Sequence, residues 1–257
     1  MAEGEQYILS ENGVVYKDRY FTGSLYAKMM HPDGVPYGTF RTSTVLLDGD
    51  DCSFKGCTFE NSAGPGKEVG QALALYVDAD GAYFEDCRLI GHQDTLVLAP
   101  LPPKEIQPGG FIGPKQFTPR TDRSVRFKHC TIEGGVDFIF GGATAIFEDC
   151  EFISVERGYV FAPSTPEHVD TGFVAINCRF TCTDNVEDGS CYIARPWRIY
   201  GKVRLENCYL GRHIHPEGFN DWNKPEAHKT AVFEEYGSYG PGAAMARRPD
   251  WVRCSGV

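Results

Sequence analysis

Apolar residues recur along this chain in one short pattern. An apolar residue is followed by two variable residues, a cysteine, one variable residue and a second apolar residue. Six copies of the pattern contain Cys57, Cys87, Cys130, Cys150, Cys178 and Cys208. The intervals between these cysteines are 30, 43, 20, 28 and 30 residues. Most of these fall in the range where one repeat forms one coil of a solenoid.

Repeats of this length cannot bury their own apolar face, so they must stack on one another. The copies are strand-like, with Gly- and Asn-containing turns and no useful helical periodicity, which predicts an all-β fold, a parallel β-helix. The six repeat cysteines are then expected to form an inward-facing ladder of small, reduced, buried thiols. The sequence leaves open the state of the other four, which are Cys52, Cys182, Cys191 and Cys254.

Two segments depart from the repeat. Residues 96–123 contain six prolines and three glycines, which predicts a long loop inserted within one coil and forming a wall of a substrate groove. The tail from about residue 212 lacks the pattern and is expected to cap or flank the stack. Residues 1–257 are otherwise expected to form one domain, in which the first 40 residues cover the open end of the helix.

Composition narrows the possible functions. The 257 residues contain 25 Lys and Arg, 35 Asp and Glu, 29 Gly and only 4 Met, which argues against an all-α protein. A net charge of −10 without basic blocks argues against nucleic-acid and membrane-surface partners. No apolar run approaches the roughly 18 residues of a membrane span, and no signal peptide is evident. The chain as given is therefore expected to be cytoplasmic, or secreted if a signal was removed.

Two acids share one position in the repeat. Asp94 follows Cys87 by seven residues, and Asp137 follows Cys130 by seven. Equivalent residues on successive coils lie roughly 4.7–4.9 Å apart across a parallel sheet. Two neighbouring carboxylates resist ionising together, which separates a protonated acid from an anionic nucleophile. A slip of one residue in register would turn one acid to the opposite face.

Around these acids, across roughly residues 39–251, the sequence resembles the pectin methylesterases, the pectinesterase family of carbohydrate esterases. The matching blocks, in chain order, are Thr42-Ser43-Thr44-Val45, Phe59 to Pro65, Gln71 to Leu75, Gln93-Asp94-Thr95-Leu96, Val136 to Gly141, Ala194-Arg195-Pro196-Trp197, and Glu235-Tyr236 with Gly240 to Ala243. The resemblance implies a right-handed, single-stranded parallel β-helix. It also implies hydrolysis of methyl esters of polygalacturonate through a carboxylate nucleophile, with no cofactor and no metal.

The resemblance assigns a catalytic role to five residues. Asp137 would be the nucleophile, and Gln71 and Gln93 would stabilise the oxyanion. Asp94 would protonate the departing methanol and then activate water. Arg195 would keep Asp137 anionic and oriented. Because Gln93 and Asp94 are adjacent, both can reach one substrate only if the chain bends near them.

Four residues are candidates for substrate contact. Trp197 would be an aromatic platform for a sugar ring, and Trp222 a second one. Phe138 lies beside the nucleophile. His92 stands where many family members have Tyr, and a structural role is the main expectation for it.

Alternatives remain at this stage. Carboxylates about 5 Å apart also suit a retaining glycosidase, and a polysaccharide lyase, an esterase for another ester or a non-catalytic carbohydrate-binding solenoid would share the fold. The expected partner is pectin or a methylated oligogalacturonide, bound by a monomer. A chain of charge −10 should disfavour the de-esterified polyanion unless local basic groups offset that charge.

Overall fold

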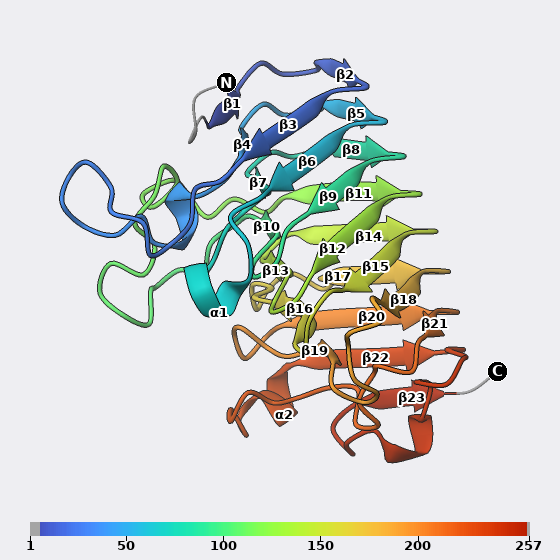
Figure 1. The fold of residues 1–257 in the computed structure, drawn as a ribbon. Helices are drawn as coiled ribbons and strands as arrows, with labels where there is room; N and C mark the ends of the chain where they lie inside the picture. The colour runs from blue at the N-terminus through green and yellow to red at the C-terminus, as the bar shows by residue number, and fades with distance from the viewer. Residues whose placement is uncertain (1–5, 256–257) are drawn as a thin grey trace.

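The computed structural model describes residues 6–255 and contains three parallel sheets that run along one axis, with successive coils stacked on one another (Figure 1). Sheet A contains β1 (Tyr7–Leu9), β4 (Val45–Leu47), β7 (Leu75–Val77), β10 (Leu96–Leu98), β13 (Ile139–Gly141), β16 (Tyr159–Pro163) and β19 (Tyr192–Ala194). Sheet B contains β2 (Val15–Lys17), β5 (Ser53–Lys55), β8 (Ala82–Glu85), β11 (Ser124–Lys128), β14 (Thr144–Glu148), β17 (Phe173–Ile176), β20 (Lys202–Glu206), β22 (Val232–Tyr236) and β23 (Arg253–Ser255). Sheet C contains β3 (Tyr20–Gly23), β6 (Thr58–Asn61), β9 (Arg88–Ile90), β12 (Thr131–Gly134), β15 (Glu151–Ser154), β18 (Arg179–Cys182) and β21 (Tyr209–Leu210).

Successive strands of the chain pass from sheet A to sheet B to sheet C, so each of the first seven coils contributes one strand to each sheet. The predicted parallel β-helix is confirmed. Helices are short: α1 (Gly66–Val69), α2 (Ala227–Thr230) and two 3₁₀ turns, Thr39–Arg41 and Met245–Arg247. None of the helices within residues 6–255 has the length and apolar character that a membrane span requires.

The interior contains the ladders that the repeat predicts. Phe54, Phe84, Phe127 and Phe147 are paired in register across sheet B, and their rings stack with centroids 4.7–4.9 Å apart. The six repeat cysteines are buried and unpaired. Left-handed backbone with φ of 52–64° precedes each of them, at Gly56, Asp86, His129, Asp149, Asn177 and Asn207. Gly, Asn, Asp and His tolerate this conformation best, which explains why one of these four residue types occupies each of these turns.

The boundaries differ from the sequence prediction in three places. The loop starts at residue 99, not 96, because Leu96 and Leu98 form β10 and pack into the core. The tail from about residue 212, which was expected to cap or flank the stack, contributes β22 and β23, and these extend sheet B. Near the N-terminus, residues 7–23 form a complete coil of their own, while residues 1–5 lie outside the described part.

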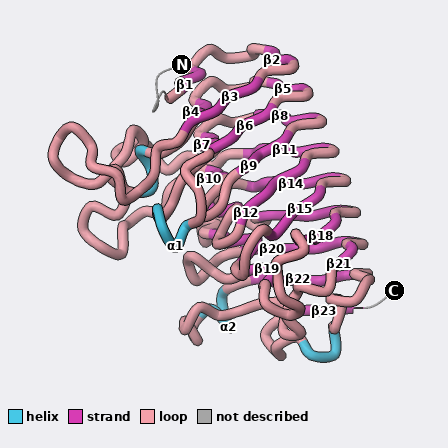
Figure 2. The backbone as a smooth tube through the Cα atoms, viewed as in Figure 1, coloured by secondary structure: helices cyan, strands magenta, loops and turns pink. Residues whose placement is uncertain are grey.

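The long loops gather on one side of the helix. The excursion after β3, the loop 99–123 and α1 all project from the side of sheet A (Figures 1 and 2). They cover a second apolar cluster on the outer surface of that sheet, in which Phe40 and Phe111 pack with Tyr76, Val97 and Phe140. The loops and the sheet thereby enclose a cavity.

Candidate active site

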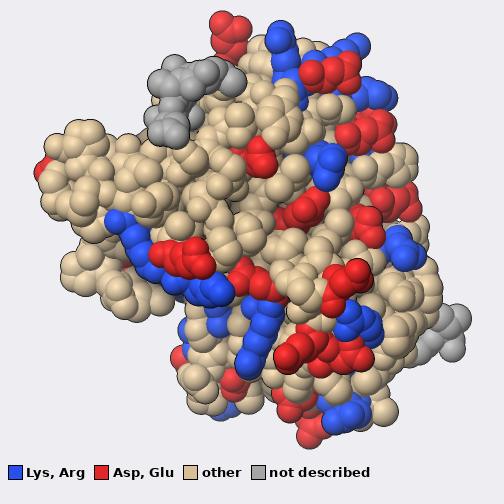
Figure 3. All heavy atoms as spheres, viewed as in Figure 1, with Lys and Arg blue, Asp and Glu red and all other residues tan. Residues whose placement is uncertain are grey.

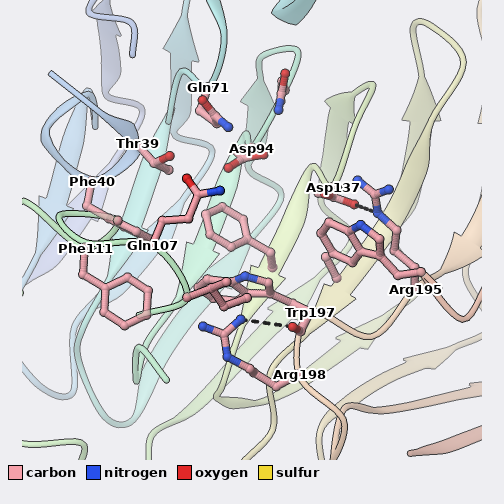
Figure 4. A pocket seen from close by; sticks show the side chains of 16 residues that line it. Thr39, Phe40, Gln71, Asp94, Gln107, Phe111, Asp137, Arg195, Trp197 and Arg198 are labelled. Atoms are coloured by element: carbon pink, nitrogen blue, oxygen red, sulfur yellow. Dashed lines mark hydrogen bonds and ion pairs between the residues drawn. The ribbon is translucent and has the colours of Figure 1, made fainter. Parts of the chain in front are cut away.

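A cavity of about 440 Å³ lies between the outer face of sheet A and the loops (Figure 4). Its lining consists of Thr39, Phe40, Gln71, Gln93, Asp94, Ile106, Gln107, Gly110, Phe111, Asp137, Phe140, Ala162, Arg195, Trp197, Arg198 and Trp222. All five residues predicted to be catalytic are in this set, as are both tryptophans. Polar side chains that converge in a concave site beside aromatic rings are typical of a ligand site.

Asp94 and Asp137 occupy equivalent positions on adjacent coils. β10 and β13 pair with Leu96 opposite Ile139, and the backbone N–H of Asp94 donates to the carbonyl of Val136 at 3.0 Å. The predicted register of the two acids is therefore confirmed. Each lies two residues before its strand in left-handed backbone, with φ of 63° and 50°.

That left-handed backbone answers the question of how two adjacent residues reach one cavity. Gln93 and Asp94 belong to a turn and not to a flat strand, so their side chains do not alternate between the two faces of the sheet. The bend lies at Asp94 itself.

Arg195, which follows β19, binds only one of the two acids. Its Nε donates to Oδ1 of Asp137 at 2.8 Å, and its Nη2 donates to Oδ2 at 2.6 Å. The guanidinium lies between two aromatic rings, 3.8 Å from the centroid of Tyr159 and 3.6 Å from that of Trp222. A bidentate contact and stacking on both faces fix the position of the charge.

The two acids therefore differ electrostatically. Burial, reinforced by the charge of Asp137, holds the pKa of Asp94 well above its usual range. Burial also raises the pKa of Asp137, but here hydrogen bonds from Arg195 act in the opposite direction. Only Asp137 has a cation in direct contact, so nothing in contact with Asp94 opposes the rise that burial causes in its pKa.

The two glutamines enter the cavity from neighbouring coils. Gln71 precedes β7, and its carbonyl accepts the backbone N–H of Ala27 at 2.8 Å. Gln93 packs tightly against the first residue of α1: a Cβ atom on Gly66 would lie 2.5 Å from Oε1 and 2.6 Å from Cβ of Gln93. A glycine at this position allows the helix to support the glutamine closely.

Two of the expected substrate contacts lie elsewhere. The Phe138 side chain has no exposed surface and packs in the core between the sheets, so the expectation that it contacts substrate is wrong. Its neighbour Asp137 lies in left-handed backbone, and the Asp137 side chain lines the cavity instead. His92 lines a different cavity of about 270 Å³, where its Nδ1 lies 3.6 Å from Oε1 of Glu156. The expected structural role fits that placement.

Several residues at the site have no counterpart in the sequence argument. Tyr159 pairs in register with Tyr192 and, by the pairing of β13 with β16, lies beside Asp137. Counting from the repeat cysteine misses it, because Tyr159 follows Cys150 by nine residues and not by seven. Arg198 and Lys224, in loops outside the repeat, add two further cations. No repeat-based signal could place them.

Comparison with known proteins identifies the family. A family model described as Pectinesterase matches residues 22–99 and 119–256. The chain belongs to the pectinesterase family. Pectinesterase 31 of Arabidopsis thaliana is 36% identical over 217 residues, which are 84% of this chain and 60% of that protein. A pectinesterase of Petunia integrifolia is 33% identical over 224 residues, which are 83% of this chain and 54% of that protein. The chain thus spans 60% or less of the length of these relatives.

Solved pectin methylesterases have the same fold. Pectin methylesterase PemA from Erwinia chrysanthemi superimposes with a TM-score of 0.75 at 26% identity, covering 98% of this chain and 81% of that one. A pectin methylesterase solved in complex with a hexasaccharide superimposes with a TM-score of 0.74 at 26% identity and covers the same share of each chain.

Proposed function

We propose that this chain hydrolyses methyl esters of polygalacturonate, in pectin or in methylated oligogalacturonides, to methanol and free carboxylate. One observation carries the proposal. Two buried carboxyls face one cavity in register, and Arg195 hydrogen-bonds Asp137 but not Asp94. This arrangement provides an anionic nucleophile beside a protonated acid, which is what acyl transfer through a covalent intermediate requires.

In the first step, a carboxylate oxygen of Asp137 attacks the ester carbonyl carbon. The C–O bond to the methoxy group breaks, the Asp94 proton passes to the leaving oxygen, and methanol departs. The product is an acyl-enzyme in which the substrate acyl group is joined to Asp137 as an anhydride. Asp94 is then a carboxylate.

In the second step, Asp94 accepts a proton from water, which attacks the substrate acyl carbon. The anhydride bond breaks, the galacturonate carboxylic acid leaves, and Asp137 is anionic again while Asp94 is again protonated. Each step passes through an oxyanion. Gln71 and Gln93 line the cavity beside the two acids, and their amide N–H groups are the proposed donors to it.

The aromatic side chains would hold the sugar. Trp197 packs edge-on against Phe140, with ring centroids 5.5 Å apart, and part of its surface lines the cavity. Trp222 also lines it while stacking on Arg195. A sugar ring bound on these indoles would place its ester over the acids.

The test compares methanol release from methylated oligogalacturonides by the wild type, Asp137→Ala and the control Asp184→Ala. Asp184 is exposed in a turn remote from the cavity. Methanol from the wild type and the control alone, with chain lengths unchanged, supports the proposal. Shortened or unsaturated chains would assign the site to a glycosidase or a lyase. Equal methanol release by Asp137→Ala would remove that residue as the nucleophile.

We also infer action as a monomer in a reducing, cytoplasmic compartment. The site supports the monomer, because one chain supplies every proposed catalytic group. The ten unpaired cysteines, two of which are partly exposed, support the reducing compartment, since oxidising compartments favour disulfides. Cell fractionation with size-exclusion chromatography tests both.

A further inference from the structure

The loop 99–123 is the part of the candidate site in which this chain departs from its family. The family model matches residues up to 99 and resumes at 119, so residues 100–118 lie outside the match. Four residues of this segment nevertheless line the cavity that contains the two acids, and they are Ile106, Gln107, Gly110 and Phe111. One wall of the cavity is therefore formed by a segment outside the family match.

Hydrogen bonds and ion pairs hold this wall in a fixed position. Lys115, which is buried, is ion-paired with Asp48 and, at 3.4 Å, with Asp78. The guanidinium of Arg120 donates at 2.7–3.3 Å to four backbone carbonyls of the loop, which are those of Pro102, Lys115, Gln116 and Thr118. Segments that open easily have few buried contacts and exposed hydrogen bonds, and this loop has the opposite character.

The loop covers the outer face of sheet A on three neighbouring strands. Leu46 on β4, Tyr76 on β7 and Val97 on β10 belong to the outer apolar cluster, and none of them is more than 2% exposed. Phe111 of the loop packs in the same cluster. A polysaccharide that ran along the outer face of these strands would need the surface that the loop already occupies. The cavity therefore ends at the loop.

The same loop reaches the turn that follows β19. The Phe111 ring packs edge-on against Phe40 and against Trp197, with ring centroids 5.8 and 6.2 Å away. Nη2 of Arg198 donates to the carbonyl of Lys104 at 3.1 Å. Phe111 thus joins the turn before β4 to the turn after β19 along one side of the cavity (Figure 4). The loop closes the cavity at its N-terminal end and along this side.

Size and charge also favour a short ligand. The cavity of about 440 Å³ lies in the lower half of the range of about 300–1,000 Å³ that small-molecule sites occupy. The chain carries a net charge of −10. Acidic and basic side chains are interspersed over the face in Figure 3, so the described residues offer a long polyanion no continuous basic surface on that face.

We propose that the loop 99–123 restricts the enzyme to the ends of galacturonan chains, so that its substrates are short methylated oligogalacturonides and not the interior of pectin. This inference rests on the proposed function. An interior unit has a neighbour on each side, and a groove that binds it must be open at both ends. A pocket closed at one end accepts a terminal unit, and the rest of the oligomer leaves by the open end.

Gln107 is placed to meet that terminal unit. Its side chain points from the loop towards Asp94 (Figure 4), and an amide has donors and an acceptor for sugar hydroxyls. The restriction also gives the enzyme a place in a reaction sequence. A reaction that cleaves the polysaccharide backbone must come first, because it supplies the chain ends.

The experiment measures methanol release per ester group from fully methyl-esterified trigalacturonate, hexagalacturonate and pectin, and mass spectrometry locates the first free carboxylate in the hexamer. The test variants are Gln107→Gly, which trims an exposed side chain from the wall, and Phe111→Ala, which removes the ring that joins the two turns. The control Phe117→Ala changes the same loop at a residue that is 91% exposed and outside the cavity lining.

In the wild type and the control, kcat/KM for the trimer should exceed that for pectin by about tenfold or more, and the terminal ester of the hexamer should be hydrolysed first. That ratio should fall about threefold or more in both test variants, because the opened wall admits interior units. Gln107→Gly removes no buried group, so it tests the wall even if Phe111→Ala folds poorly.

The outcomes separate this inference from the proposed function. Equal kcat/KM for the trimer and for pectin in the wild type would overturn the restriction and leave the esterase standing. A preference for chain ends that persists unchanged in both test variants would overturn the loop as its cause. If no substrate releases methanol, the esterase is rejected and calorimetry tests the wall alone. The wild type should then bind trimer and hexamer with equal Kd, whereas the test variants should bind the hexamer more tightly; tighter binding of the hexamer by the wild type would overturn the wall.

Discussion

In the proposed mechanism Arg195 keeps Asp137 anionic, so replacing Arg195 should alter the pH dependence of the reaction and not only its rate. In Arg195→Ala, the buried carboxylate of Asp137 loses both of its charged hydrogen bonds. Its pKa rises further, because burial is then no longer opposed by a contacting cation. The ionised fraction of the nucleophile at near-neutral pH must fall.

The size of the effect follows from the geometry. Two hydrogen bonds to a charged group contribute about 1.5–3 kcal/mol each, and breaking a buried ion pair costs about 3–5 kcal/mol. Both side chains are only 11–14% exposed, so solvent screens the pair weakly. A loss of this size corresponds to about a 100- to 10,000-fold decrease in kcat/KM. Arg195→Lys keeps the positive charge but loses the bidentate hydrogen bonding of the guanidinium. Its kcat/KM should therefore lie between those of the wild type and Arg195→Ala.

The assay is methanol release from a methylated oligogalacturonide between about pH 4 and pH 9. In the proposed mechanism activity needs ionised Asp137, so activity should decline as pH falls through the pKa of that residue. The acidic limb of the profile should therefore move to higher pH in Arg195→Ala and return partly in Arg195→Lys. An equal loss at every pH, with the acidic limb unmoved, would refute the claim that Arg195 sets the charge of Asp137.

Three further predictions concern neighbouring features. Asp94→Asn should abolish methanol release yet melt higher than wild type above about pH 4. The difference should grow as pH rises towards the raised pKa of Asp94, because the unfolded wild type loses this proton while the folded state still holds it; equal melting curves would contradict this. Gly66→Ala should reduce kcat/KM about 10- to 100-fold by displacing Gln93; unchanged kinetics would show that the contact is unimportant. Phe84→Ala should lower the unfolding free energy, measured by urea titration, by about 3–5 kcal/mol. The control Phe117→Ala should leave that free energy unchanged, because Phe117 is 91% exposed.

The fold could be predicted from the sequence because the coils repeat the same inward pattern. Each repeat cysteine marks a turn between sheets B and C, and that turn has the same length in every repeat-containing coil. The turns from sheet C to sheet A vary instead. Counting seven residues from the cysteine therefore places Asp94 and Asp137 correctly. In the next coil the same count would assign the equivalent position to Arg157, whereas the structure has Tyr159 there.

The candidate site was only partly predictable for the same reason. Residues on the repeat, or in blocks that resemble the family, could be named in advance. Those on irregular loops could not, because their positions depend on tertiary contacts of the loop 99–123 and of the tail. Gln107, Phe111 and Lys224 are examples. Phe138 was misplaced because adjacency in sequence to Asp137 says nothing about which face a side chain takes.

The order of coils explains how one repeated position gives two different acids. The acids precede β10 and β13, whereas Arg195 follows β19 in the same sheet. Asp137 thus lies two strand spacings of roughly 4.8 Å from the arginine's strand, and Asp94 lies three. The Arg195 side chain extends across the intervening strand β16, over the ring of Tyr159, and binds the nearer carboxylate, that of Asp137. The farther acid, Asp94, remains buried beside the charge of Asp137, and both raise its pKa without a contacting cation to oppose them. The electrostatic asymmetry of the pair therefore arises from position along the helix axis.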